Sequence, residues 1–322
     1  MPIFRRGSDD EREAQSRAET EQAASLDALA HGALPLRAQE RLEEIGKAAS
    51  GFFTSDLSVD EFALVHALGL RPISQVMGSS IYHVGWQRQP GSFGGWQPSG
   101  VSQELTVVSD AWNTARLRAF ARLEQEAKLV GASAVVGVHV TRGRHDWAAG
   151  AIEYVAVGTA VRAAGAEPVE SPTLSDLSGQ DTWKLWQSGY RPLGVVGAST
   201  VHYVVPGWST QQVSGYWSSW ANQELRDFTR GVYDARETAL GRMTDEARKI
   251  GAAGVVGVSI EHNVEEREAS GGGTRRTDLL VTFHVIGTAI GERQADGLDL
   301  DLSPRIELRK DSLSPHVLGG SR

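Results

Sequence analysis

The chain has 322 residues, a formal net charge of −8 and no cysteine. The negative charge argues against a protein that binds nucleic acid by neutralising phosphates and against a polybasic membrane anchor, whereas the lack of cysteine excludes disulfides, thiolate metal ligands and cysteine nucleophiles. No segment is apolar for long enough to predict a transmembrane helix, and the first residues lack the apolar stretch of a signal peptide, so we expect a soluble cytoplasmic protein with no nucleic-acid partner and no membrane insertion.

The two ends of the chain differ in composition from its middle. Residues 1–50 are charged, rich in alanine, glutamate and arginine, and poor in glycine. This composition fits either one or two solvated helices, for example from Leu36 to Ile45, or a mobile arm. Residues 293–322 contain prolines and few apolar side chains, which predicts a C-terminal tail.

The middle of the chain is a tandem repeat. Ser55–Arg142 aligns without a gap with Ser175–His262, so each residue of the second copy carries a number 120 higher than its counterpart. A gap-free match of this length predicts the same fold twice. We place the first domain at residues 51–168 and the second at residues 169–292.

Each copy has the pattern of a strand, a long helix and two further strands. The first strand is predicted over Ile73–Val84 and Leu193–Val205, where β-branched residues follow an Arg-Pro turn. The helix is predicted over Ser102–Val130 and Asn222–Ile250, because apolar residues recur three and four positions apart. A helix of this length would measure about 43 Å. That is more than a compact two-layer domain needs, so part of it should pack on a neighbouring unit.

Four repeated glycines mark the end of the helix and the strand that follows it. Gly131 and Gly251 come after the last helical residues, where a helix stop favours a positive φ. Gly137 and Gly257 interrupt the apolar strand that follows, which predicts a β-bulge or a close backbone approach.

Both copies contain a helix with the pattern ARxxAxxRxxxEA, then GAxxVVGV, then a strand that ends in Gly-Thr-Ala. In these features, residues 55–165 and 175–292 resemble the YbjQ-like family of small bacterial proteins, which is labelled as a heavy-metal-binding domain. The resemblance implies a β-α-β-β unit, similar to the dodecin subunit, that assembles into rings, typically pentamers, and it implies no known enzyme activity. We therefore expect an α+β fold of two tandem β-α-β-β units, each with a long helix on a small antiparallel sheet, assembling into a ring.

The histidines predict a metal site only weakly. The repeat brings His83 and His202 closest to correspondence, but Tyr82-His83 is matched by His202-Tyr203 in reversed order. Adjacent strand residues point to opposite faces, so the two imidazoles would lie on different faces of their strands. This fits packing or surface positions better than a shared divalent metal, which needs three or four converging donors. A metal site formed by symmetry-related His83 or His202 side chains at the axis of a ring remains an alternative. The sequence does not identify a cofactor.

The loops between the first strand and the helix are rich in aromatic residues. They contain Trp86, Trp96, Trp208, Tyr216, Trp217 and Trp220. Flat apolar side chains of this kind suit packing between subunits, docking of a macromolecular partner or stacking of a small planar ligand. We expect packing between subunits first, and a protein partner would use these loops or the terminal arms.

Three charged positions of the helix recur in both copies. They are Arg116, Arg122 and Glu126 in the first, and Arg236, Arg242 and Glu246 in the second. Arg122–Glu126 and Arg242–Glu246 lie four residues apart, which predicts ion pairs on a solvated helix face or between subunits. No nucleophile elbow or phosphate-binding loop accompanies them, so no enzyme activity is predicted.

These features together predict a non-enzymatic structural or interaction protein. It would form a homo-oligomer, either a pentameric or a stacked ring of YbjQ-like domains. The alternative is a protein that binds a metal or a small planar ligand at its subunit interfaces.

Overall fold

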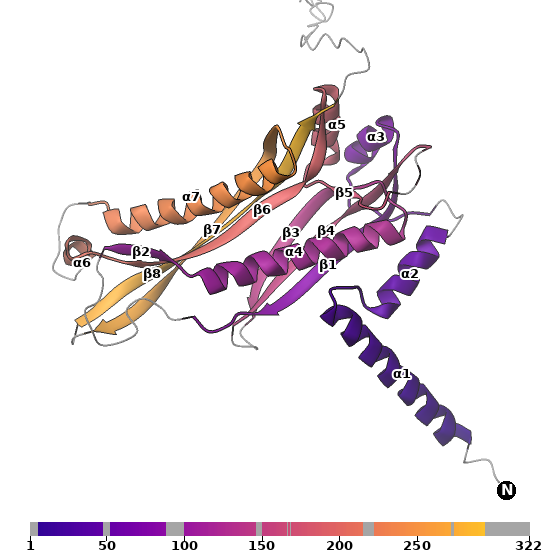
Figure 1. Cartoon of the computed structure of the whole chain (residues 1–322), viewed down its shortest axis with the longest axis horizontal. Helices are drawn as coiled ribbons and strands as arrows, with labels where there is room; N and C mark the ends of the chain where they lie inside the picture. Colours follow the sequence, from indigo (N-terminus) through magenta and orange to yellow (C-terminus); the bar gives the residue numbers. More distant parts are fainter. Residues whose placement is uncertain are drawn as a thin grey trace, which may run out of the picture.

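The computed structural model describes residues 6–47, 52–87, 100–145, 150–165, 167, 169–214, 222–271 and 274–293. Within these residues the chain forms two four-stranded sheets, each covered by one long helix (Figure 1). Sheet A has the strand order β1 (Leu70–His83), β4 (Ala151–Ala163), β3 (Ala134–His145) and β5 (Thr173–Leu174). Sheet B has the order β2 (Val101–Glu104), β6 (Tyr190–Val205), β8 (Thr274–Glu292) and β7 (Gly254–Gly271). All neighbouring strands are antiparallel except β3 and β5, so the α+β fold class is confirmed.

The two repeats exchange short strands. β2 precedes the helix of the first repeat but pairs with β6 of the second, and β5 of the second repeat pairs with β3 of the first. The prediction that the first helix begins at Ser102 is therefore wrong, because Ser102 lies in β2 and its backbone is paired with β6. The helices are α4 (Thr106–Leu129) and α7 (Arg226–Lys249), of 24 residues each.

Helix α4 packs on both repeats. It lies on β1 and β4 of its own sheet, and its N-terminal half also lies on β6 of sheet B. Leu105 and Trp112 share a buried apolar cluster with Val201 and Tyr203 of β6, so the repeats have a continuous core. The expectation that part of this helix packs on a neighbouring unit is confirmed, and the neighbour is the second repeat of the same chain. Helix α7 lies on β6 and β8.

The repeated glycines have the backbone conformations that their positions predicted. Gly131 and Gly251 follow the two helices with φ values of 70° and 71°. Gly137 and Gly257 have φ values of 65° and 67°, and the pairing of β3 and of β7 shifts register around them. These are β-bulges, and a residue with a Cβ atom would be strained there.

The repeated Ser-Asp-Leu-Ser stretch anchors the start of each unit to its last strand. The Ser55 hydroxyl and the Asp56 backbone N–H both contact the Thr159 hydroxyl, and Ser175 and Asp176 contact Thr288 in the same way. The final serine of each stretch caps a short helix, α3 (Val59–Ala67) or α5 (Gly179–Gln187). These two helices pack against one another (Figure 1).

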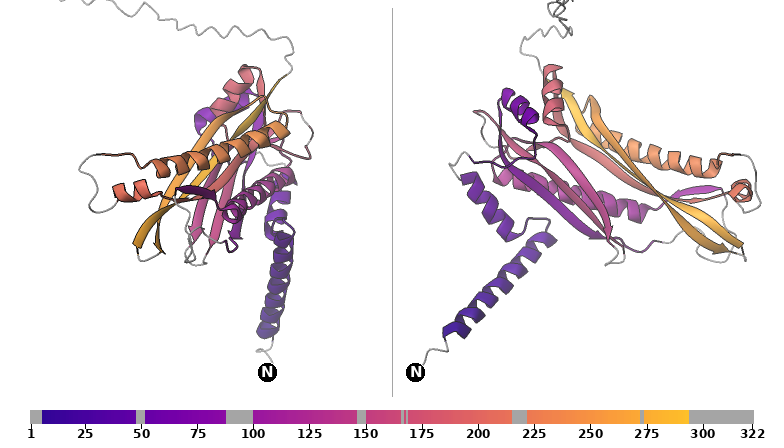
Figure 2. Two further views of the ribbon diagram at one scale, coloured as in Figure 1. Left: turned by 60° about the vertical axis from the view of Figure 1, so that its left-hand side comes forward. Right: turned by 180° about the vertical axis from the view of Figure 1, so that it is seen from behind.

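Residues 6–47 form the helices α1 (Arg6–Ala30) and α2 (Leu36–Lys47). Helix α1 projects away from the sheets, whereas α2 lies against α4 (Figure 2). Leu42 of α2 is fully buried in the cluster that contains Leu123 and Ala127 of α4. None of the described helices combines the length and apolar character that crossing a membrane requires.

The contact between β1 and α4 depends on Gly78. A Cβ atom there would overlap the carbonyl oxygen of Ala119 and the amide nitrogen of Leu123, which are backbone atoms of the helix. We expect Gly78→Ala to lower the free energy of unfolding by about 2–3 kcal/mol, because the helix must move off the strand. Gly241→Ala on α7 is the control: nothing lies within 4 Å of its added Cβ, and alanine should stabilise the helix by about 0.5–1 kcal/mol. Urea unfolding checks both, and equal effects would contradict the assigned contact.

Candidate interface between the repeats

Side chains from two helices seal the part of the β6 edge that β2 does not cover. β2 pairs with residues 202–205 of β6. Beyond it, the Ser109 hydroxyl accepts a hydrogen bond from the Val201 N–H (2.9 Å), and the Asn113 side chain bonds both the N–H and the carbonyl of Ser199 (2.9 and 2.8 Å). Glu246 of α7 accepts a hydrogen bond from the Gly197 N–H at 3.1 Å. The strand edge is thus completed by one helix from each repeat.

The ion pair of Arg116 on α4 with Glu246 on α7 links these two helices directly. The Arg116 guanidinium donates two hydrogen bonds to the carboxylate, with Nη1–Oε1 at 3.3 Å and Nη2–Oε2 at 3.0 Å. The Arg116 side chain is almost completely buried. A bidentate pair fixes the orientation of both side chains. This pair therefore sets the position of α4 relative to α7.

A second bidentate pair joins β2 to α7. Arg242 donates to Glu104, with Nη1–Oε1 at 2.6 Å and Nη2–Oε2 at 2.9 Å. Glu104 was not among our candidate residues, although its recurrence in the repeated Gln-Glu-Leu stretch (Glu104 and Glu224) was a signal that could have identified it.

The predicted ion pairs along the helices do not form. Arg242 and Glu246 contact the other repeat instead, as described above. Arg122 donates hydrogen bonds to the carbonyls of Ser79 and Leu29, and Glu126 accepts one from the Met77 N–H. The spacing of charged residues along the helix could not predict these contacts, because the partners come from elements that are distant in sequence.

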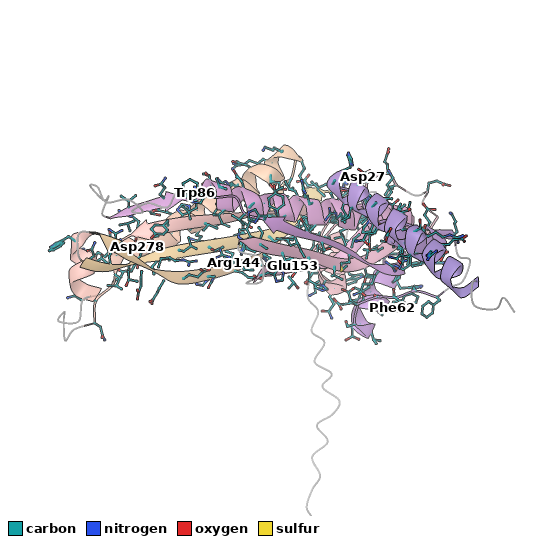
Figure 3. The ribbon with its side chains drawn as sticks, turned by 90° about the horizontal axis from the view of Figure 1, so that it is seen from below. Asp27, Phe62, Trp86, Arg144, Glu153 and Asp278 are labelled. Carbon is teal, nitrogen blue, oxygen red and sulfur yellow. The ribbon has the colours of Figure 1, made fainter. Side chains whose placement is uncertain are left out.

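The strands of the two sheets also meet through ion pairs. Arg142 of β3 lies 3.3 Å from Glu261 of β7, and Arg144 lies 2.9 Å from Glu265. Figure 3 shows Arg144 near the middle of the long axis, between Asp278 on one side and Phe62 on the other. A cleft of about 320 Å³ opens beside these pairs and is lined by Trp112, Arg142, Arg144, Glu261 and His284, among others.

His284 of β8 is held neutral in the wall of this cleft. Its ring packs edge-on against Trp112, with 4.8 Å between centroids, and its Nδ1 lies 2.8 Å from the Ser199 hydroxyl. Burial, and then the positive charges of Arg142 and Arg144, lower the pKa of His284 to about 3. Proton transfer at this ring near neutral pH is therefore disfavoured, and the residue serves packing between the repeats.

The two candidate metal ligands lie on different sheets. His83 is exposed at the end of β1, whereas His202 is buried on β6 with its Nδ1 3.2 Å from the Ser102 hydroxyl. Burial lowers the pKa of His202. In the described part of the chain, no three histidine or carboxylate side chains gather as a set of metal donors. Within one chain, the described residues therefore do not bring His83 and His202 together as metal ligands.

Of the six candidate aromatic residues, the structure describes two. Trp86, which follows β1, and Trp208, at the start of α6 (Trp208–Ser214), are both strongly exposed. Trp96, Tyr216, Trp217 and Trp220 lie outside the described residues.

The contribution of Arg116 can be measured by substitution. Arg116→Met leaves the carboxylate of Glu246 without its guanidinium partner in a mostly buried place, so we expect a loss of about 2–3 kcal/mol in the free energy of unfolding. The double variant Arg116→Met/Glu246→Met should recover part of this loss. The control is Arg248→Met, on the same helix as Glu246. Arg248 is exposed and pairs with the exposed Asp245, so its replacement should change stability by about 0.5 kcal/mol or less.

His284 should make folding stability depend on pH. The unfolded chain protonates this histidine near its ordinary pKa of 6.5, while the folded chain keeps it neutral down to about pH 3, so stability is lost as the pH falls below 6.5. Between pH 7 and pH 5 we expect wild type to lose about 2 kcal/mol more than His284→Gln. Burial raises the pKa of Asp176 to about 6, and this acts in the opposite direction, which is why the comparison with the variant is needed. Urea unfolding at both pH values checks this. An equal pH dependence in His284→Gln and in the exposed-site control His262→Gln would contradict it.

Known proteins resemble this chain along nearly its whole length. The profile of the YbjQ family, described as "Putative heavy-metal-binding", matches residues 98–164 and 193–291. A protein of Mycobacterium tuberculosis named as an encapsulin nanocompartment protein is 37% identical over 299 residues, which cover 90% of this chain and 100% of that relative. No solved structure matches the chain significantly. Both repeats, each with its long helix and the strands that pack on it, place the chain in the YbjQ family.

Proposed function

We propose that this chain is a non-enzymatic, oligomer-forming structural component of a protein nanocompartment in the cytoplasm. The observation that supports this most is the similarity to a relative named as an encapsulin nanocompartment protein, since it spans all of that relative. The similarity thus includes both repeats and the interface between them.

The interface between the repeats also supports a structural role. Its ion pairs, Arg116–Glu246 and Glu104–Arg242, are bidentate, and Asn113 and Ser109 bond directly to the backbone of β6. Such contacts fix the relative orientation of two domains, as a building block of a closed particle requires. We propose a closed ring, pentameric or stacked, as the form of the oligomer.

A protein partner would use exposed aromatic side chains and the N-terminal arm. Trp86 and Trp208 are exposed, and aromatic residues of this kind are common anchors at interfaces. Helix α1 extends away from both sheets and offers a second surface (Figure 2).

A native mass spectrum of the untagged protein tests the proposed function. We expect one large multiple of the 34.7 kDa chain, and electron micrographs of the same sample should contain closed particles of uniform size. A monodisperse single chain at micromolar concentration would contradict the proposal. A fixed excess mass on every chain would favour the alternative function, binding of a metal or planar ligand.

A further inference from the structure

The interface between the repeats is asymmetric, and each chain carries a second copy of both of its sides that does not form such an interface within the chain. The first repeat contributes β2 and the start of α4, whereas the second contributes the face of β6 and the charged residues Arg242 and Glu246. The equivalents of the first set are residues 222–225 and the first half of α7 up to Arg236, which we call the docking segment. The equivalents of the second set are β1, Arg122 and Glu126, which we call the acceptor.

The charged residues of the interface recur with the same chemistry on the docking segment and the acceptor. In the docking segment, Glu224 corresponds to Glu104 and Arg236 to Arg116. In the acceptor, Arg122 corresponds to Arg242 and Glu126 to Glu246. Glu126 is also oriented in the same way as Glu246. It accepts a hydrogen bond from the Met77 N–H at 2.8 Å, just as Glu246 does from Gly197.

Among the described residues, Arg236 has no partner of this kind. Its side chain is 42% exposed and lies 3.2 Å from Glu237, the next residue of the same helix. Its counterpart Arg116 is only 6% exposed and is held by Glu246. The same residue type in the same helical position is thus buried in one repeat and left in solvent in the other.

Apolar residues show the same contrast. Ile81 on β1 is 57% exposed, whereas its counterpart Val201 on β6 is fully buried beneath α4. β1 also has β4 as its only partner strand in the described chain, while β6 lies between β8 and β2. Side chains bond the free edge of β1 at Gln75, Met77 and Ser79. The part of the edge at Ile81 has no such partner among the described residues, and an exposed apolar residue beside an open strand edge is a surface on which another chain can add a strand.

The opposite end of the molecule has a matching open edge. In the internal interface, the bulge of β3 is covered by the start of the second repeat: the Gly137 N–H donates to the Leu177 carbonyl and the Val138 N–H to the Ser175 carbonyl. The equivalent strand β7 is the outer strand of sheet B. Its Val258 is 40% exposed, compared with 3% for Val138.

We propose that the second repeat of one chain docks on the first repeat of a second copy and reproduces the internal interface between chains. The docking segment lies along β1 and covers Ile81, Arg236 pairs with Glu126, and Glu224 pairs with Arg122. The Ser55–Leu57 segment of the second copy lies along β7 of the first. This specifies the surfaces of the oligomer and rests on the proposed function.

The N-terminal arm occupies part of the acceptor in the single chain. The carbonyl of Leu29 accepts a hydrogen bond from Arg122, and Arg41 of α2 lies close enough to Glu126 to lower its pKa against the larger, raising effect of burial. Docking replaces these two contacts by Glu224 and Arg236. The arm and a second copy therefore compete for the same two charged residues.

Two variants, each with one blocked surface, test the proposal. Arg236→Glu blocks the docking segment by placing a carboxylate opposite Glu126. Ile81→Lys blocks the acceptor with a charge on its apolar face. Both positions are exposed in the single chain, so both variants should fold like wild type. Arg248→Glu on α7 and Leu26→Lys on α1 are matched controls at exposed positions outside both surfaces.

Native mass spectrometry gives the readout. We expect each blocked variant alone to be a single chain, and both controls to assemble like wild type. An equal mixture of the two blocked variants should give a particle of two chains and nothing larger, because the intact docking segment of Ile81→Lys binds the intact acceptor of Arg236→Glu and both outer surfaces are blocked.

The possible failures are distinguishable. If both blocked variants assemble like wild type, the oligomer uses other surfaces, so this inference is overturned while the proposed function stands. If the blocked variants are single chains and their mixture forms no two-chain particle, the two surfaces do not bind one another, and the inference is again overturned. If wild type itself is a single chain, the proposed function and the inference both fail.

Discussion

The open edge of β6 is the constraint on which the arrangement of the repeats depends. Unpaired backbone groups at a buried strand edge are costly, so Val201, Ser199 and Gly197 need partners beyond the reach of β2. α4 supplies Ser109 and Asn113, and α7 supplies Glu246. The two helices come from different repeats, and Arg116 joins them by pairing with Glu246. One strand edge thereby fixes how sheet A, sheet B and both helices lie relative to one another.

This arrangement explains why the two copies have diverged at equivalent positions. Gly131 and Gly251, and Gly137 and Gly257, are the same in both copies because each terminates a helix or forms a bulge within its own unit. The charged residues of the interface also recur, but two of the uncharged residues that meet the other repeat differ: Trp112 and Asn113 of α4 correspond to Val232 and Tyr233 of α7. Of the two long helices, α4 packs on β6 of the second sheet, whereas the contacts of α7 with the described strands are to sheet B, so the two helices have different neighbours within the chain.

Sequence reasoning predicted the features that are local to one unit. The repeat, the strand at Ile73–Val84, the helix stops and the bulges follow from glycine positions and from apolar periodicity, which act over a few residues. The helix start at Ser102 was wrong because β2 owes its conformation to pairing with β6, about 100 positions away. The ion pairs along the helices were wrong for the same reason. The cleft with Trp112 and His284 could not be predicted, since it forms where two sheets meet.

The covalent link between the repeats affects how many repeats a ring can contain and how assembly depends on protein concentration. Tethering makes the Arg116–Glu246 interface intramolecular, so it forms at the high effective concentration of a short linker and persists at any dilution. Only contacts between chains would respond to protein concentration, and the proposed assembly would start from chains whose two repeats are already joined. Because each chain contributes two repeats, any closed ring of whole chains contains an even number of repeats. Five chains would form a ring of ten repeats, and a ring of five repeats could not be built from whole chains.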